Sequence, residues 1–123
     1  MIDHTGIGVA DVGRSAIFYD AALGALGMRR AMQIPSDSGI DGVGYGFEYS
    51  VFWIERFHPH SVKLHTAFAA KTIAEVAAFY AAALKAGGME NGASGLRRSL
   101  HSSLTRMAIT SRRFSAAQSP TAR

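Results

Sequence analysis

The 123-residue chain contains no cysteine, is 48% hydrophobic and 18% charged, and carries a formal net charge of +4. This length fits a single domain spanning residues 1–123 and is too short for an enzyme with a separate nucleotide-binding half. The missing cysteine excludes disulfides, thiolate catalysis and cysteine-ligated zinc, and the longest apolar run, residues 76–84, is too short to cross a membrane. The first residues do not follow the pattern of a secretory signal, so we expect a cytoplasmic protein.

The chain opens with a predicted strand over residues 2–9. Its alternation places His4 on a face of small residues, away from the bulkier apolar side that should pack on helices. A helix follows, because Asp11 is a suitable N-cap and Gly27 a natural C-terminal stop. Phe18 and Ala22 recur at helical spacing and predict its core-facing stripe.

Three further strands are predicted after this helix. They cover residues 28–35, 43–50 and 51–58, with a turn-rich loop over 36–42 and a tight connection near residues 49–50. The last two should pair antiparallel. Residues 1–60 therefore read as a βαβββ module.

A second module begins in residues 61–93. Residues 62–69 are predicted to form a strand with His65 on its face of smaller residues. Thr72 and Glu75 have the spacing of a capping box at the start of a second helix, which Gly87 and Gly88 should end.

The two modules are an internal repeat. Shifting the chain by 61 residues aligns residues 4–28 with 65–89, and 11 of these 25 positions are identical. The identities include the His-Thr, Phe-Tyr and Gly-Met pairs in one register, which indicates duplication.

The excess positive charge lies outside this repeat. Residues 1–93 hold seven basic and nine acidic residues, whereas residues 94–123 hold six arginines, seven serines and no acid. Such a composition is typical of GC-rich DNA read out of frame, and one hypothesis is that this atypical tail is frame-shifted. The tail has no nucleic-acid recognition motif, so neither a nucleic acid nor a membrane is expected as a partner.

The repeated module, with a histidine early in each first strand, resembles the vicinal-oxygen-chelate superfamily, which includes glyoxalase I, bleomycin-resistance proteins and extradiol dioxygenases. The residues that carry the resemblance lie within residues 2–5, 15–27, 52–54, 64–68 and 78–95. It implies an α+β fold of two βαβββ modules, the second incomplete or altered. A homodimer is the usual arrangement in this superfamily and is expected here.

The resemblance also implies a divalent metal (Zn, Ni, Fe or Mn) held by the first and last strands of each module. His4 and His65 match the first-strand ligands, and Glu55 is the carboxylate nearest the fourth-strand position, although Trp53 is an alternative occupant of that position. The last ligand is normally a glutamate near the C-terminus, and this chain has no acidic residue after Glu90.

Three functions remain open on this basis. The first is a metal-dependent lyase or dioxygenase acting on a small oxygen-bearing molecule. The second is a metal-free small-molecule-binding protein of bleomycin-resistance type, and the third is an inactive product that lacks the last ligand. The resemblance implies that the sheets of the two modules form a cup around the binding site. In the first two functions, four residues are expected to line this cup and contact the ligand: Tyr45, Phe47, Trp53 and Arg56.

Overall fold

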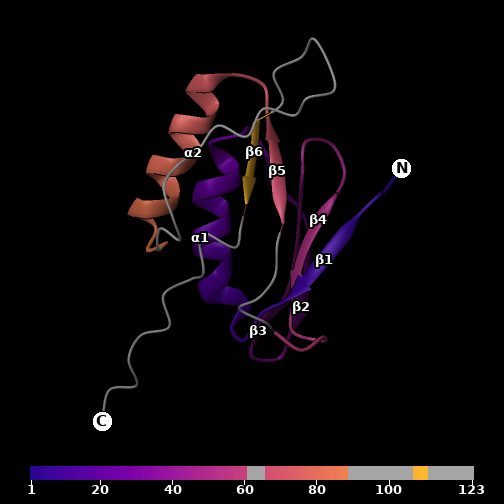
Figure 1. The fold of residues 1–123 in the computed structure, drawn as a ribbon. Coiled ribbons are helices and arrows are strands. Elements are labelled where there is room, and N and C mark those ends of the chain that lie inside the picture. Colours follow the sequence, from indigo (N-terminus) through magenta and orange to yellow (C-terminus); the bar gives the residue numbers. More distant parts are fainter. Residues whose placement is uncertain (61–65, 89–106, 111–123) are drawn as a thin grey trace.

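The computed structural model describes residues 1–60, 66–88 and 107–110. Two helices and six strands lie in these parts of the chain (Figure 1). In chain order they are β1 (Thr5–Gly8), α1 (Val12–Gly24), β2 (Arg29–Ser36), β3 (Gly39–Gly46), β4 (Phe52–Glu55), β5 (Ala67–Ala70), α2 (Ile73–Lys85) and β6 (Met107–Thr110). Neither described helix has the length and apolarity needed to span a membrane.

The first module has the predicted βαβββ order. Its four strands form one sheet in the order β1-β4-β3-β2, in which β1 runs parallel to β4 and the other pairs are antiparallel. Strands β5 and β6 form a separate antiparallel pair. This mixed α+β arrangement confirms the fold class inferred from the sequence.

Strand β1 is shorter than the predicted strand over residues 2–9, and β3 and β4 are both displaced from their predicted boundaries, with β3 ending at Gly46 rather than at residue 50. The predicted loop over residues 36–42 is mostly strand, because β3 already begins at Gly39 and only Asp37 and Ser38 separate it from β2. Strand β4 ends at Glu55 rather than at residue 58, since the Glu55 side chain accepts hydrogen bonds from the next turn.

Both helices begin and end as the sequence predicts. The Asp11 side chain accepts a hydrogen bond from the Arg14 amide at 3.0 Å, and Thr72 Oγ1 accepts one from the Glu75 amide at 3.1 Å. At the C-terminal ends, Gly27 and Gly87 adopt positive φ angles of 85° and 94°. Glycine tolerates this left-handed conformation better than other residues do.

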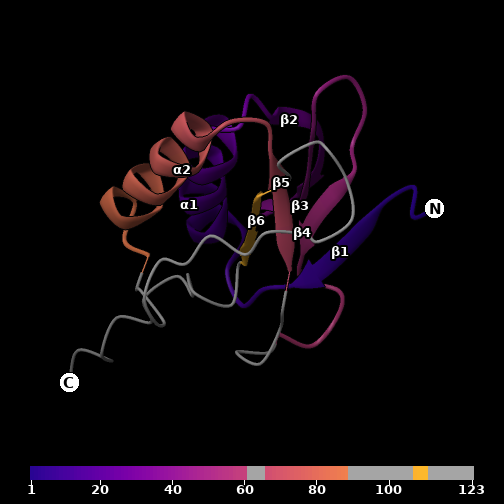
Figure 2. The ribbon, with the colours of Figure 1, turned by 45° about the horizontal axis from the view of Figure 1, so that its top comes forward.

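The core lies between the helices and the sheet. Helix α1 packs on β2, β3 and β4 and also on α2, and the two views in Figures 1 and 2 show both helices on the same side of the four-stranded sheet. A chain of ring contacts crosses this core. Between ring centres, Phe52 of β4 lies 5.4 Å from Tyr19 of α1 and 4.9 Å from Phe68 of β5. The ring centre of Phe68 lies 6.3 Å from that of Phe79 of α2.

Equivalent positions of the repeat differ in burial. Ala22 and Ala83 are both fully buried, as expected for the shared helix stripe. The equivalent leucines are unlike each other: Leu23 has no exposed surface, whereas Leu84 is 39% exposed. At this position the surface of α1 is therefore fully covered by other side chains, whereas the surface of α2 is partly open to solvent.

The burial of Tyr19 makes the free energy of unfolding depend on pH in the alkaline range. Burial raises the pKa of this phenol to about 12 from an ordinary value of about 10. Because the neutral phenol is favoured in the folded state, its contribution is complete below pH 10 and is lost as the pH rises toward 12. We expect urea unfolding to show a loss of up to about 3 kcal/mol from this residue over that range.

The substitution Tyr19→Phe isolates this contribution, because it keeps the ring and removes the titrating hydroxyl. The stability difference between the variant and the unchanged protein should shift in favour of the variant above pH 10. Parallel stability curves from pH 8 to 12 would contradict the assignment.

Candidate functional site

The side of the four-stranded sheet that faces away from the helices is called here the open face. Phe52 and Ile54 of β4 are buried toward the helices, so Trp53 and Glu55 point to the opposite side. The strand register places glycines beside them on both neighbouring strands. On the open face these are Gly6 and Gly8 of β1 and Gly42, Gly44 and Gly46 of β3.

These five glycines are called here the glycine floor. Trp53 is the largest side chain that lies against it and is partly buried. Gly6 of β1 pairs with it directly, and a Cβ added to Gly6 would lie 3.1 Å from the Trp53 Cβ. On the other side, a Cβ added to Gly44 would lie 2.8 Å from Trp53 Cε2. The indole therefore extends from β4 across Gly44, and glycine at this position leaves the room that the ring occupies.

The loop between β3 and β4 folds over the same floor. A Cβ added to Gly44 would lie 2.4 Å from Ser50 Oγ, and one added to Gly46 would overlap the Tyr49 carbonyl oxygen at 1.8 Å. The loop is held by a hydrogen bond from the Val51 amide to the Tyr45 carbonyl at 2.8 Å. Alternating glycines on β3 thus allow both the indole and this loop to lie against the backbone.

Glu55 lies on the open face, but its carboxylate is bound to its own turn. Oε2 accepts hydrogen bonds from the amides of Phe57 and His58, and Oε1 lies 2.7 Å from His58 Nδ1. The Glu55 side chain is 11% exposed. These contacts hold the carboxylate in the turn that ends β4, and the backbone of His58 and Pro59 after it lies over Gly8 of β1.

His4 lies on the same side of the sheet but not beside Glu55. Thr5 pairs with Phe52, so His4 is level with Val51, four residues before Glu55 on the parallel strand. Four residues correspond to about 13 Å along a strand. His4 is instead 2.8 Å from Asp3 through Nδ1, and its side chain is 62% exposed. His65 lies outside the described residues.

These positions do not form a metal centre in the described part of the chain. No group of three or more His, Asp or Glu side chains there is close enough together to hold an ion. Trp53 is two residues nearer to the level of His4 than Glu55 is, but its indole offers only an N–H donor and no lone pair for a metal. Of the proposed ligands that the structure describes, His4 and Glu55 are therefore not placed to share one ion.

Tyr45 was predicted to line the cup, and the structure places it on the other side of the sheet. It is 1% exposed, and its hydroxyl donates to Asp20 Oδ1 at 2.9 Å and lies 3.3 Å from the Ala16 carbonyl oxygen of α1. Tyr45 lies on the helix side because it pairs with Phe52 of β4. The sequence alone does not show which residues of β3 and β4 pair, so the predicted side was wrong.

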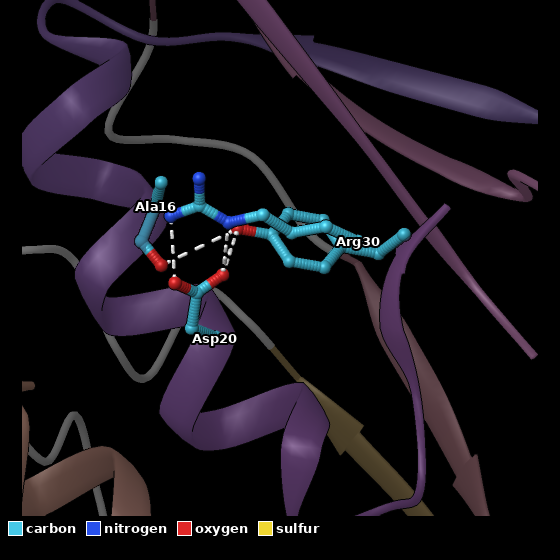
Figure 3. Close-up of polar contacts among 4 residues, drawn as sticks. Ala16, Asp20 and Arg30 are labelled. Atoms are coloured by element: carbon cyan, nitrogen blue, oxygen red, sulfur yellow. Dashed lines mark hydrogen bonds and ion pairs between the residues drawn. The ribbon is translucent and has the colours of Figure 1, made fainter. Parts of the chain in front are cut away.

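Asp20 holds two partners at once. Its carboxylate accepts hydrogen bonds from Arg30 Nε at 2.8 Å and Nη2 at 2.7 Å, in addition to the Tyr45 hydroxyl (Figure 3). The hydrogen bond with Asp20 raises the pKa of Arg30. Burial raises the pKa of Tyr45, and the hydrogen bond with Asp20 raises it further. This cluster ties α1 to β2 and β3, on the side away from the open face.

The two other predicted ligand contacts lie beyond the ends of the strands. Phe47 is 50% exposed, and the Lys71 ammonium lies 5.6 Å from its ring centre. Arg56 forms an ion pair with Asp41 and lies 5.8 Å from the Phe57 ring. Of the predicted residues that the structure describes, Trp53 and Glu55 thus lie together on the open face, whereas Tyr45 lies on the other side of the sheet and Phe47 and Arg56 lie past the strand ends.

Sequence reasoning missed the glycine floor and Ser50. The signal for the floor is present in the sequence as glycine at every second position from Gly42 to Gly46. In a strand this spacing puts all three on one face. Ser50 carries no such signal, because its place over Gly44 results from the path of the loop.

Comparisons with known proteins agree with this fold. No family model matches the chain, and no curated protein sequence matches it either. Among solved structures, a glyoxalase/bleomycin resistance protein from Albidiferax ferrireducens T118 is similar, with a TM-score of 0.61 and 29% sequence identity. The match covers 78% of this chain and 80% of that chain.

Proposed function

Since the chain belongs to the vicinal-oxygen-chelate superfamily, we propose that it is a binding protein of bleomycin-resistance type that takes a small planar aromatic molecule on its open face without a metal. The observation that carries this proposal is the partly buried Trp53 indole, which lies over Gly44 of β3 and has Gly6 of β1 beside its Cβ. A flat ring bound there would stack on the indole.

The floor favours a flat and apolar ligand. The glycines of β1 and β3 add no side chains beside the indole, so the surface offered to a ligand there is the flat indole itself, and the apolar side chains of Met32 and Ile34 border the floor on β2. Stacked aromatic pairs contribute about 0.5–1.5 kcal/mol beyond the apolar area that they bury. Binding by stacking also needs no ionised or metal-bound group at this site.

The alternative is a metal-dependent lyase or dioxygenase that uses His4, His65 and Glu55. A working site needs about three protein ligands around one ion with an open position left for the substrate. The offset between His4 and Glu55, together with the hydrogen bonds that hold the Glu55 carboxylate, favours the binding protein.

Trp53 is the single tryptophan of the chain, so its fluorescence reports directly on this face. We expect its emission to change on titration with bleomycin or with small aromatic compounds in the presence of EDTA. By calorimetry, Trp53→Ala should weaken binding at least about tenfold, since it removes the stacking partner and its buried area.

A matched control is Phe57→Ala, which removes another aromatic ring that is 58% exposed and lies past the end of β4. This variant should bind like the unchanged protein. Unchanged Trp53 emission across the whole series, or equal loss in both variants, would reject binding on the open face.

Metal analysis separates the two functions. The unchanged protein, incubated with Zn²⁺, Ni²⁺, Fe²⁺ or Mn²⁺ and then desalted, should retain no stoichiometric metal. Retention of one ion per chain that His4→Ala abolishes would instead establish the metal-dependent alternative. His4 is a suitable probe because its exposed side chain contributes little to folding.

A further inference from the structure

The hydroxyl of Ser50 is buried without a hydrogen-bond partner in the described parts of the chain. It lies over Gly44, at 2.4 Å from the point where a Cβ would be, and Trp53 Cε2 contacts the same point at 2.8 Å. The hydroxyl and the indole therefore occupy one small space on the open face.

An unpaired buried hydroxyl is costly, because it has lost its hydrogen bonds to water and gained none in return. Such groups are rare in folded proteins, and where one occurs at a candidate binding site it is available for a ligand. Apolar replacements such as alanine would fit over Gly44 without this cost.

The neighbourhood of Ser50 allows a ligand to approach. Trp53 beside it is only partly buried, and the two large loop residues on its N-terminal side, Phe47 and Tyr49, are 50% and 64% exposed. A ligand would reach the hydroxyl by displacing the indole from the space over Gly44 that the two groups share.

We propose that Ser50 determines which ligand the open face prefers, by hydrogen bonding to a hydroxyl or carbonyl group on an aromatic ring stacked against Trp53. This inference rests on the proposed function and narrows it from aromatic molecules in general to oxygen-bearing aromatic molecules, such as phenols and aryl ketones. Ser50 is a binding residue in this scheme and carries out no covalent step.

The test compares naphthalene with 2-naphthol, two flat probes that differ in one hydroxyl group. By calorimetry the unchanged protein should bind 2-naphthol about fivefold more tightly, as expected for one neutral hydrogen bond. In Ser50→Ala this preference should disappear, with naphthalene binding unchanged. The same variant should melt a few degrees higher, because it removes an unpaired buried group.

The chain offers a close control in Ser36. Its hydroxyl is also buried and unpaired in the described residues, but it lies at the β2–β3 hairpin, where Ser36 pairs with Gly39. Ser36→Ala should raise the melting temperature similarly and leave the preference for 2-naphthol intact.

The outcomes separate this inference from the function on which it rests. If naphthalene binds in a Trp53-dependent way but Ser50→Ala keeps the 2-naphthol preference, or melts lower, the role of Ser50 is wrong and the binding function stands. If neither probe binds the unchanged protein, both proposals fail.

Discussion

Replacing Phe52 with alanine is expected to lower the free energy of unfolding by about 3–5 kcal/mol, the range for truncating a buried aromatic side chain. Phe52 is 2% exposed and packs edge-on against Phe68 at 4.9 Å, with Tyr19 on its other side at 5.4 Å. It thus contacts both α1 and the strand of the second module. Truncation leaves a cavity between three elements that cannot all move to fill it.

Urea unfolding followed by circular dichroism measures this loss. Phe57→Ala is the matched control, because Phe57 is an aromatic residue near the end of the same strand and is 58% exposed. It should change stability by less than about 0.5 kcal/mol, the usual range for surface positions. A loss below about 1 kcal/mol for Phe52→Ala would contradict its central place in the core.

The second large effect is expected from Gly46→Ala, which should destabilise the protein by about 3 kcal/mol, the upper part of the range for overpacking. The new Cβ would lie 1.8 Å from the Tyr49 carbonyl oxygen, a backbone atom that cannot rotate away. The β3–β4 loop would have to lift from the floor, so Trp53 emission should also change.

Gly24→Ala provides a control with the opposite sign. Gly24 is the last residue of α1, and a Cβ there would meet nothing within 4 Å. Alanine at this helical position should stabilise the protein by about 0.5–1 kcal/mol. Equal effects of the two substitutions in urea unfolding would show that the close approach of Tyr49 to β3 is wrong.

The helices could be predicted from the sequence because their signals are local. Asp11, Thr72 and Glu75 act within one turn of the backbone groups that they cap, and Gly27 and Gly87 end the helices by their own conformation. Local chemistry of this kind does not depend on the rest of the fold.

The start of β3 was missed for the opposite reason. Glycine is unfavourable in strands on its own, so residues 39–46 read partly as a loop. In the structure Gly44 and Gly46 are required by the loop and strand that follow, since Ser50, Trp53 and the Tyr49 backbone fold back against them. No local propensity includes such contacts.

The site was predictable in part. Trp53 and Glu55 were expected on the cup side, and alternation along β4 puts them there. The hydrogen bonds between the Glu55 carboxylate and the turn through His58 could not be foreseen, because they depend on how the chain bends after the strand. The position of Tyr45 depends on which residue of β4 it pairs with, and that pairing is tertiary information.

The unequal burial of Leu23 and Leu84 bears on how the two copies of the repeat evolve. A substitution at position 23 opens a cavity in the core, whereas one at position 84 alters a side chain that is already 39% in contact with solvent. We therefore expect purifying selection to act more strongly at position 23 than at position 84. Among relatives of this chain, the trace of the duplication should fade first from the outer face of α2.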